Sequence, residues 1–359
     1  MGKYKAALIS LGSESSEWTL DAMRKYFAAV DDINLKKIEV NFSGKEAEVL
    51  YEGKALPQYD CIYAKGSFRY AQLLQGLTSL LGKSCYMPID ASAFTVAHDK
   101  LLTQLALQHH NIPMPRTYQA ATIEAAKSIL KQMNFPIIMK FPQGTGGKGV
   151  VFAESYASAS SILDAFTALN QPFILQEYIE TGGTDVRAIV VGGKVVAAME
   201  RKADITEKRA NVHTGGRGEA TELDDRTKHL AVKVARAIKA DICGVDILMS
   251  AKGPLVIEAN VSPGLQGITR ATKVDVADCI AKFLFERTTV LREGEQKVKA
   301  SKVLEEAGLN GDSLITTLDF RGNRVLLPEV IVKKAGFTED DNYELSVKQG
   351  SLLIKKFEM

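Results

Sequence analysis

Short apolar segments with strand character alternate with amphipathic helices through residues 1–290 of this chain. Residues 5–9, 35–40 and 60–65 are such strand segments, and residues 19–30 carry apolar side chains at helical spacing. Apolar positions that recur every three or four residues predict a helix, whereas short continuous apolar runs predict buried strands. Alternation of the two with short connections favours an open, parallel sheet covered by helices. We therefore predict a chain with α/β and α+β parts and exclude an all-helical or all-β protein.

The composition places the chain among ordinary globular proteins. Hydrophobic residues make up 46% and charged residues 25% of the 359 positions, which excludes a disordered, collagenous or fibrous chain. The 45 Lys and Arg nearly balance the 43 Asp and Glu. The resulting net charge of +2 creates no global field that would attract nucleic acid or a membrane surface.

No segment predicts export or a membrane span. The longest apolar runs, such as residues 135–139, are far shorter than the ~20 residues that cross a bilayer. The N-terminal apolar run lacks the length and the small-residue cleavage site of a signal peptide. The cysteines have no CxxC spacing and are expected to be free thiols; they are Cys61, Cys85, Cys243 and Cys279. We expect a cytoplasmic protein.

Changes of pattern divide the chain into four parts. These are an N-terminal α/β domain over 1–96, a second domain over 97–290, a linker over 291–311 and a small module over 312–359. Residues 291–300 are charged and lack apolar periodicity, which is why a linker is predicted there. The module contains about four predicted strands and one helix, and its size is near the lower limit for folding alone.

A glycine-rich loop, residues 142–149, follows the predicted strand 136–140. Its glycines let backbone N–H groups approach a phosphate closely. The loop is not a Walker A motif, because no Gly-Lys-Ser/Thr opens a helix, and a strand rather than a helix follows it. Lys140, on the preceding strand, adds a charge that pairs with phosphate. A flexible hairpin turn is the competing interpretation of the loop taken alone.

Acidic and amide side chains interrupt two otherwise apolar predicted strands, 243–249 and 255–260. Glu258 and Asn260 are two positions apart and therefore share one face, and Asp246 on the partner strand can lie opposite them. Oxygen ligands alone suit Mg²⁺, whereas zinc prefers His or Cys. A metal would also compensate the burial of these polar groups. The competing interpretation is a polar cluster at the end of a sheet.

Two further segments carry polar side chains next to predicted strands. The segment 200–217 is basic and glycine-bearing, and it predicts either an anion-clamping loop or a solvated run of charges. Asp185 and Arg187 share one face of the strand 184–191. Residues 176–179 leave a strand for a loop, where backbone groups become free to bind a ligand.

In this order along the chain, these features resemble the ATP-grasp ligases. The order is Lys100, Lys140, the glycine loop, Gln176–Ile179, Asp185-x-Arg187, Arg209-x-Asn211 and Asp246…Glu258-x-Asn260. The segments Gly244-Val-Asp-Ile-Leu and Asn260-Val-Ser-Pro-Gly-Leu-Gln-Gly-Ile268 are similar to the RimK group, glutamate ligases that modify ribosomal protein. The resemblance covers about residues 1–290. It implies an ATP-grasp fold preceded by an open α/β pre-ATP-grasp domain.

The resemblance also implies roles for individual residues. The phosphates of ATP would be bound by Lys100, Lys140 and the loop residues Gly144, Thr145, Gly146 and Gly147. The adenosine part would be bound by Asp185 at the ribose and by Gln176, Glu177, Tyr178 and Ile179, with Glu177 and Ile179 acting through their backbone. The metal, Mg²⁺ or alternatively Mn²⁺, would be held by Asp246, Glu258 and Asn260. Arg209 and Asn211 would face the transferring phosphate, with Arg187 as a third catalytic residue, and the acceptor site would be bordered by Arg201, Ser262 and Gly264.

The implied reaction is an ATP-dependent ligation of a carboxylate to an amine. A carboxylate attacks the γ-phosphoryl group, and an amine captures the acyl-phosphate to give an amide, ADP and phosphate; catalysis relies on positioning and charge neutralisation. L-Glutamate is the expected amino acid, and the acceptor is a protein or small-molecule carboxylate. The loop carries Gly146 and Lys148 where the family more often has glutamine and an aliphatic residue, which leaves the amino-acid preference open. The alternatives are a ligase acting on a cofactor tail or an amino-group carrier protein, and an ATP-binding regulator.

The tail has a resemblance of its own. Residues 320–336 and the strands after them resemble an AbrB/MazE-type swapped-hairpin domain. Such domains pair as dimers, commonly on DNA, so the resemblance implies a homo-oligomer. Residues 291–359 contain 11 Lys and Arg against 12 Asp and Glu. Because a DNA-binding face needs a basic patch, dimerisation or partner docking is favoured over DNA binding.

Overall fold

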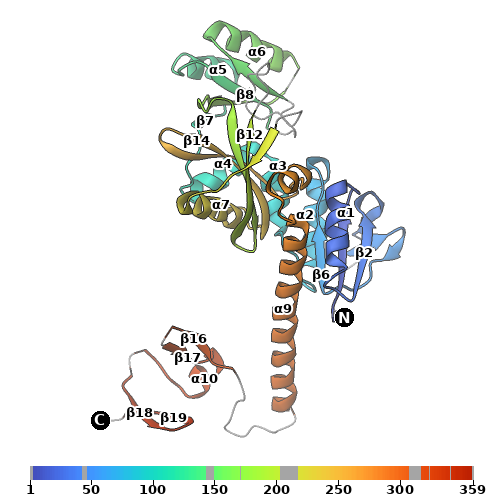
Figure 1. Ribbon diagram of the computed structural model, residues 1–359, viewed down its shortest axis with the longest axis vertical. Helices are drawn as coiled ribbons and strands as arrows, with labels where there is room; N and C mark the ends of the chain where they lie inside the picture. The colour runs from blue at the N-terminus through green and yellow to red at the C-terminus, as the bar shows by residue number, and fades with distance from the viewer. Residues whose placement is uncertain are drawn as a thin grey trace. The chain divides into compact units, whose positions relative to one another are not determined.

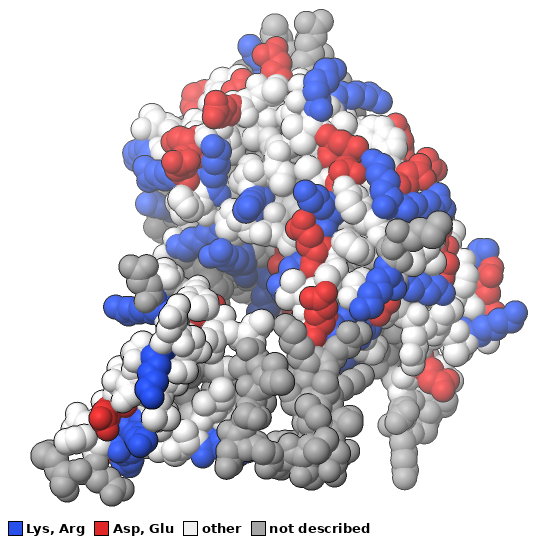
Figure 2. All heavy atoms as spheres, turned by 60° about the horizontal axis from the view of Figure 1, so that its bottom comes forward, with Lys and Arg blue, Asp and Glu red and all other residues white. Residues whose placement is uncertain are grey.

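The computed structural model describes residues 3–42, 47–142, 149–169, 171–202, 217–306, 317–322, 324–339 and 341–357. The chain divides into two compact units, residues 1–293 and residues 294–359, each of which is described by itself. Within the described ranges, no helix combines the length and apolar content that crossing a membrane requires. On the face of the molecule drawn in Figure 2, basic and acidic side chains are interspersed, in keeping with the small net charge.

The first unit begins with an open, parallel sheet in the strand order β2-β1-β6 (Figure 1). Its strands are β1 (Lys5–Ser10), β2 (Ala29–Asn34) and β6 (Cys61–Ala64). Helix α1 (Glu14–Met23) follows Ser13, whose side chain accepts a hydrogen bond from Ser16 N and so satisfies a free amide at the helix start. The parallel pairing confirms the predicted open sheet.

The helix predicted over residues 19–30 is wrong in its bounds. It ends at Met23, and residues 29–34 form the edge strand β2. Only Ile33 of that strand is buried, so the strand has no apolar run that would have shown it in the sequence. The remaining elements of this part are η1 (Leu35–Lys37), β3 (Ile38–Asn41), β4 (Glu48–Tyr51), β5 (Lys54–Ala55), η2 (Phe68–Tyr70), α2 (Ala71–Leu81) and α3 (Ala91–His98).

Two antiparallel sheets make up the rest of the first unit. A four-stranded sheet, ordered β7-β10-β8-β9, contains β7 (Thr117–Tyr118), β8 (Ile137–Lys140), β9 (Val150–Ala153) and β10 (Ile174–Glu177). Helices α5 (Ile123–Leu130) and α6 (Tyr156–Ala168) share with it a core that includes Leu130, Met139, Leu163 and Phe166.

The five-stranded sheet, ordered β13-β12-β11-β14-β15, carries six of the candidate site residues: Asp185, Arg187, Arg201, Asp246, Glu258 and Asn260. Its strands are β11 (Thr184–Val191), β12 (Lys194–Lys202), β13 (Arg217–Ala220), β14 (Ile242–Ser250) and β15 (Gly253–Asn260). Gly192 and Gly193 join β11 to β12 with φ values of +59° and +76°, the positive values that a two-residue hairpin turn requires. A Cβ on Gly192 would lie 2.4 Å from the Phe283 ring, so only glycine fits there. Helices α4 (Lys100–His109), α7 (Asp225–Ala237) and α8 (Gln266–Thr272) complete this part.

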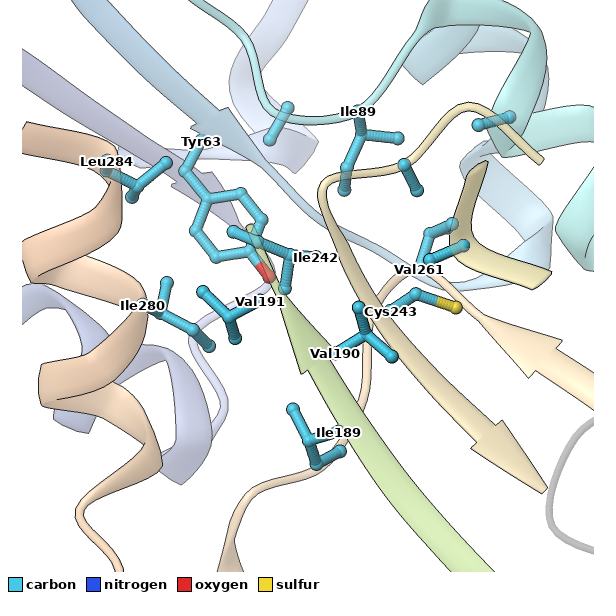
Figure 3. Close-up of a cluster of buried hydrophobic side chains, with 14 of the residues drawn as sticks. Tyr63, Ile89, Ile189, Val190, Val191, Ile242, Cys243, Val261, Ile280 and Leu284 are labelled. Atoms are coloured by element: carbon cyan, nitrogen blue, oxygen red, sulfur yellow. The ribbon is translucent and has the colours of Figure 1, made fainter. Parts of the chain in front are cut away.

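One hydrophobic core joins the N-terminal sheet to the five-stranded sheet (Figure 3). Tyr63 of β6 points towards Ile242 of β14 and Val191 of β11. Ile280 and Leu284, from helix α9 (Val276–Glu306), lie on another side of the same cluster. The predicted boundary at residues 96/97 therefore falls inside a single compact unit, within helix α3.

The linker predicted from residue 291 is helical as far as the structure describes it. Helix α9 runs unbroken from Val276 to Glu306, and residues 307–311 lie outside the described part of the chain. Residues 291–300 are rich in good helix formers, so the absence of apolar periodicity did not mean the absence of a helix. Arg292 fixes this segment by donating from Nε to Asp60 Oδ1 (2.8 Å) and from Nη2 to Ser84 O (3.0 Å).

The second unit consists of two hairpins and one helix in its described part. The elements are β16 (Asp319–Arg321), β17 (Arg324–Leu326), α10 (Glu329–Lys334), β18 (Tyr343–Lys348) and β19 (Ser351–Lys356). This content agrees with the four strands and one helix expected from the sequence. Residues 307–316 lie outside the described part of the chain, and β16 begins at Asp319.

Candidate active site

A buried arginine–carboxylate network lies at the centre of the five-stranded sheet. Arg187 of β11 lies opposite Asp246 of β14 in the strand register. It donates from Nε to Asp246 Oδ1 (2.8 Å) and from Nη2 to Oδ2 (2.7 Å), and both residues are buried. Two parallel bonds of this kind fix the orientation of both side chains.

Arg201 of β12 extends the network to a second carboxylate. It donates from Nε to Asp185 Oδ1 (2.7 Å), and its Nη2 lies 2.9 Å from Asp246 Oδ2. Burial raises the pKa of Asp185, and the neighbouring Asp246 charge raises it further. Burial alone would also raise the pKa of Asp246, but Arg187 and Arg201 hold it well below its usual range. Asp246 is therefore ionised at neutral pH.

The predicted metal ligands lie where the sequence analysis placed them relative to one another. Asp246 is opposite Glu258 in the pairing of β14 with β15, and Asn260 follows Glu258 on the same face. Burial raises the pKa of Glu258, and the Asp246 charge adds to the rise. Asn260 Oδ1 accepts a hydrogen bond from Ser262 N (2.8 Å), which fixes the amide.

This arrangement fits a hard divalent cation. Two buried carboxylates that repel each other are stabilised by a cation between them, and a carboxylate that accepts from arginine still has lone pairs for a metal. Asn260 offers an amide oxygen beside the two carboxylates, as the sequence analysis predicted for a third ligand. An oxygen-only donor set is the one that Mg²⁺ prefers.

Two lysines approach the carboxylates. Lys140, buried at the end of β8, donates from Nζ to Gln176 Oε1 on β10 (2.6 Å). Burial lowers the pKa of Lys140 to about 8, and Glu258 opposes that shift. Burial also lowers the pKa of Lys100, again against the charge of Glu258. Lys100 lines a cavity of about 30 Å³ together with Glu258 and Asn260.

The segment expected to meet adenine lies at the end of β10. Glu177 N donates to Arg116 O (2.9 Å), so this amide is already bonded within the protein. The Glu177 side chain accepts from Arg116 N (2.7 Å). Tyr178 packs edge-on against Phe152 at 5.2 Å between ring centroids, and Ile179 is half-buried. Since the Glu177 N–H is already bonded, adenine would have to bind backbone groups that follow it in the chain.

The turn expected to border the acceptor joins this site to the N-terminal sheet. Ser262 Oγ accepts a hydrogen bond from Gly66 N (3.0 Å). At Gly264 a Cβ would lie 3.4 Å from Gln266 Oε1. Leu265 N donates to Ser15 Oγ (2.9 Å) at the start of α1. The start of α1 and the loop after β6 are thereby attached to residues 262–265.

Several predicted residues fall outside the part of the chain that the structure describes. They are Gly144, Thr145, Gly146, Gly147, Arg209 and Asn211. Their roles remain predictions.

Some residues that support the site carry no signal in the sequence. Thr117 Oγ1 accepts from Gln176 Nε2 (2.8 Å), which orients the amide that holds Lys140. Thr117 lies on a two-residue strand with no sequence pattern of its own. His98 lines the cavity beside Lys100, and burial lowers its pKa.

Solved structures of other proteins share this fold. The ATP-grasp ligase PsnB, complexed with minimal precursor, Mg and ADP, is 17% identical with a TM-score of 0.62, over 79% of this chain and 98% of that one. The D-alanine–D-alanine ligase of Bacillus anthracis complexed with ATP is 16% identical with a TM-score of 0.59, over 82% and 100%. The fold is thus that of the ATP-grasp ligases.

Sequence comparison gives the family. A RimK-like ATP-grasp domain matches residues 97–284. A probable alpha-L-glutamate ligase 2 of Pseudoalteromonas atlantica is 38% identical over 261 residues, 71% of this chain and 86% of the relative. A ribosomal protein bS6–L-glutamate ligase of Salmonella schwarzengrund is 37% identical over 257 residues, 70% and 84% respectively. The chain belongs to the RimK-like ATP-grasp family and is an ATP-grasp ligase.

Proposed function

We propose that this ligase uses ATP to join L-glutamate to the carboxylate of an acceptor. The main support for this proposal is the buried network in which Arg187 and Arg201 orient Asp246 opposite Glu258. Such a site concentrates charges that suit a nucleotide, a metal and a carboxylate substrate. Relatives at 38% and 37% identity are named as L-glutamate ligases, one of them for ribosomal protein bS6, which supports glutamate and a protein acceptor.

ATP would be bound between the two antiparallel sheets by residues of both. Lys140 and Lys100 bring positive charge to the phosphates, and the glycine loop 144–147 supplies backbone amides. Asp246, Glu258 and Asn260 would hold Mg²⁺, which when bound neutralises phosphate charge and orients the nucleotide. Asp185 would reach the ribose only in exchange for part of its bonding to Arg201.

The reaction needs no covalent bond to the enzyme. An oxygen of the acceptor carboxylate attacks the γ-phosphorus, and the bond to the ADP oxygen breaks. The amine of the amino acid then attacks the acyl carbon, phosphate leaves, and the amine loses a proton to solvent. Arg187, held by Asp246, and the predicted residues Arg209 and Asn211 stabilise negative charge on the transferring group.

The decisive experiment is ADP release by the purified protein with Mg²⁺-ATP, one amino acid at a time, and mass spectrometry of the products. Glutamate-dependent release with mass increments of glutamyl units supports the proposal. Equal or greater turnover with another amino acid overturns the glutamate assignment. Acceptors that are small molecules or amino-group carrier proteins, offered in parallel, separate these alternatives from modification of a ribosomal protein.

We further propose that the second unit is an AbrB-like module that pairs with a second copy. Among the described residues from 317 to 357, no side chain is buried. Exposed apolar side chains include Phe320 (67%), Leu345 (63%), Val347 (77%) and Leu352 (55%). Isolated two-stranded hairpins are only marginally stable in water, and a second copy would bury these faces. Because residues 291–359 have no net positive charge, a DNA-binding regulator is the less favoured alternative.

A further inference from the structure

Lys65 lies at the edge of the N-terminal sheet where ligands bind in open α/β folds. It follows β6 directly, and its backbone N donates to Ile9 O on β1 (2.9 Å). Lys65 is therefore at the carboxyl end of two adjacent parallel strands. Ligands of open parallel sheets bind outside the carboxyl ends of the strands.

The backbone after Lys65 is attached to the active site. Gly66 N donates to Ser262 Oγ (3.0 Å), and Ser262 N donates to Asn260 Oδ1 (2.8 Å). A Cβ on Gly66 would lie 2.9 Å from Leu35 Cδ2, so this backbone fits closely against its neighbours. Lys65 is thus held next to the turn that borders the proposed acceptor site, through a short chain of hydrogen bonds to a proposed metal ligand.

The Lys65 side chain is buried without a counter-charge from the described part of the chain. Only 6% of the residue is exposed. Its ammonium lies 5.8 Å from the centroid of the Tyr63 ring, and neither an ion pair nor a hydrogen bond of this group is found among the described residues. Burial alone lowers its pKa, to about 8. Buried lysines are rare unless they are paired.

Lys140, the other buried lysine of the site, does have partners for its ammonium group. Lys140 has Gln176 as a hydrogen-bond partner and the charge of Glu258 nearby. In the proposed function Lys140 and Lys100 both bind the phosphates of ATP, so Lys65 is not needed for that role. In the proposed reaction the acceptor's reacting carboxylate becomes an amide, whereas the carboxylates of the incoming amino acid remain charged throughout. A fixed buried cation suits an anion that persists from substrate to product.

We propose that Lys65 binds a carboxylate of the incoming amino acid and so determines the preference for an acidic amino acid. This inference rests on the proposed function. In this arrangement the N-terminal sheet recognises the amino acid, and the two antiparallel sheets bind the nucleotide.

The test compares Lys65→Met, Lys65→Arg and the wild type, with Lys83→Met as an exposed-lysine control. For Lys65→Met, the KM for glutamate is expected to rise about tenfold or more while the KM for ATP stays the same. Lys65→Arg, which keeps the charge, should recover most of the loss, and Lys83→Met should behave as the wild type. The preference for glutamate over glutamine should fall in Lys65→Met. An unchanged KM for glutamate, or an equal rise in the KM for ATP, overturns the inference.

A binding measurement separates this inference from the proposed function. Thermal unfolding is followed with Mg²⁺-ADP and added glutamate, without turnover. A glutamate-dependent rise in Tm in the wild type that is absent in Lys65→Met supports the Lys65 site even if no ligation is seen. If glutamate stabilises both proteins equally, or neither, the Lys65 assignment is wrong, whatever the outcome of the ligation assay. Lys65→Met without ligand is expected to be at least as stable as the wild type, because a buried unpaired charge is removed.

Discussion

Arg187 and Asp246 bind each other through two hydrogen bonds, of 2.8 and 2.7 Å, across the neighbouring strands β11 and β14. Both are almost fully buried, and Asp246 also faces Arg201 and Glu258. The pair therefore links the interior of the sheet to the predicted metal ligands. A change at either residue affects the geometry of the site and the stability of the fold together.

Arg187→Lys is expected to lower the free energy of unfolding by about 3 kcal/mol, because lysine keeps the charge but cannot form the two-bond contact with the buried Asp246. Urea unfolding measures the change. Arg24→Lys is the matched control, since Arg24 and Asp21 pair on the surface with side chains 54% and 70% exposed; there the change should stay below about 1 kcal/mol. Equal effects of the two substitutions would contradict a structural role for the buried pair.

Glu258→Gln and Asn260→Ala are expected to reduce ADP formation by about a hundredfold or more, because each removes a proposed ligand of Mg²⁺. The rate is measured over a range of Mg²⁺ concentrations. Partial recovery at high Mg²⁺ would identify the defect as one of metal binding. Asp225→Asn, whose side chain is 91% exposed, serves as control and should leave the rate unchanged. Normal rates in the Glu258 and Asn260 variants would show that the metal is held elsewhere.

ATP binding is expected to weaken above about pH 8, because burial lowers the pKa of Lys140 to about 8 from its ordinary value of 10.5. Between these two pH values Lys140 loses its proton in the folded protein but keeps it in the unfolded chain, so the free energy of unfolding rises with pH. Over the same range the neutral amine no longer attracts phosphate. The KM for ATP, measured from about pH 7 to 9.5, should rise by at most tenfold per pH unit. In Lys140→Arg, where the charge persists, the rise should be absent. An equal pH dependence in that variant would assign the titration to another group.

Paired substitution of Leu345→Asp and Val347→Asp is expected to convert the proposed oligomer to a monomer. These side chains share one face of β18 and are exposed by 63% and 77%, so they are available to a second copy. Light scattering during size-exclusion chromatography gives the mass. Ser346→Asp, on the opposite face of the same strand, should leave the oligomer intact. A monomeric wild type would contradict the pairing of the second unit.

Local patterns in the sequence predicted the elements whose side chains alternate clearly. The pairing of β14 with β15 and the position of Asp246 opposite Glu258 followed from two short strands around one turn. Strand β2 was missed because a largely exposed edge strand carries no apolar run. The helix over 291–306 was missed because its sequence is charged and lacks apolar periodicity.

The sequence by itself determined the class of fold, the order of the site residues along the chain and which of them share a strand face. These depend on the period of the backbone and on nearby residues, and both can be read along the chain. Only the tertiary structure decided that Arg187 binds Asp246, that Thr117 orients Gln176, and that Gly66, the residue after Lys65, binds Ser262. Those contacts join strands and loops far apart in sequence, and they are fixed by sheet order and shared burial, which no local pattern encodes.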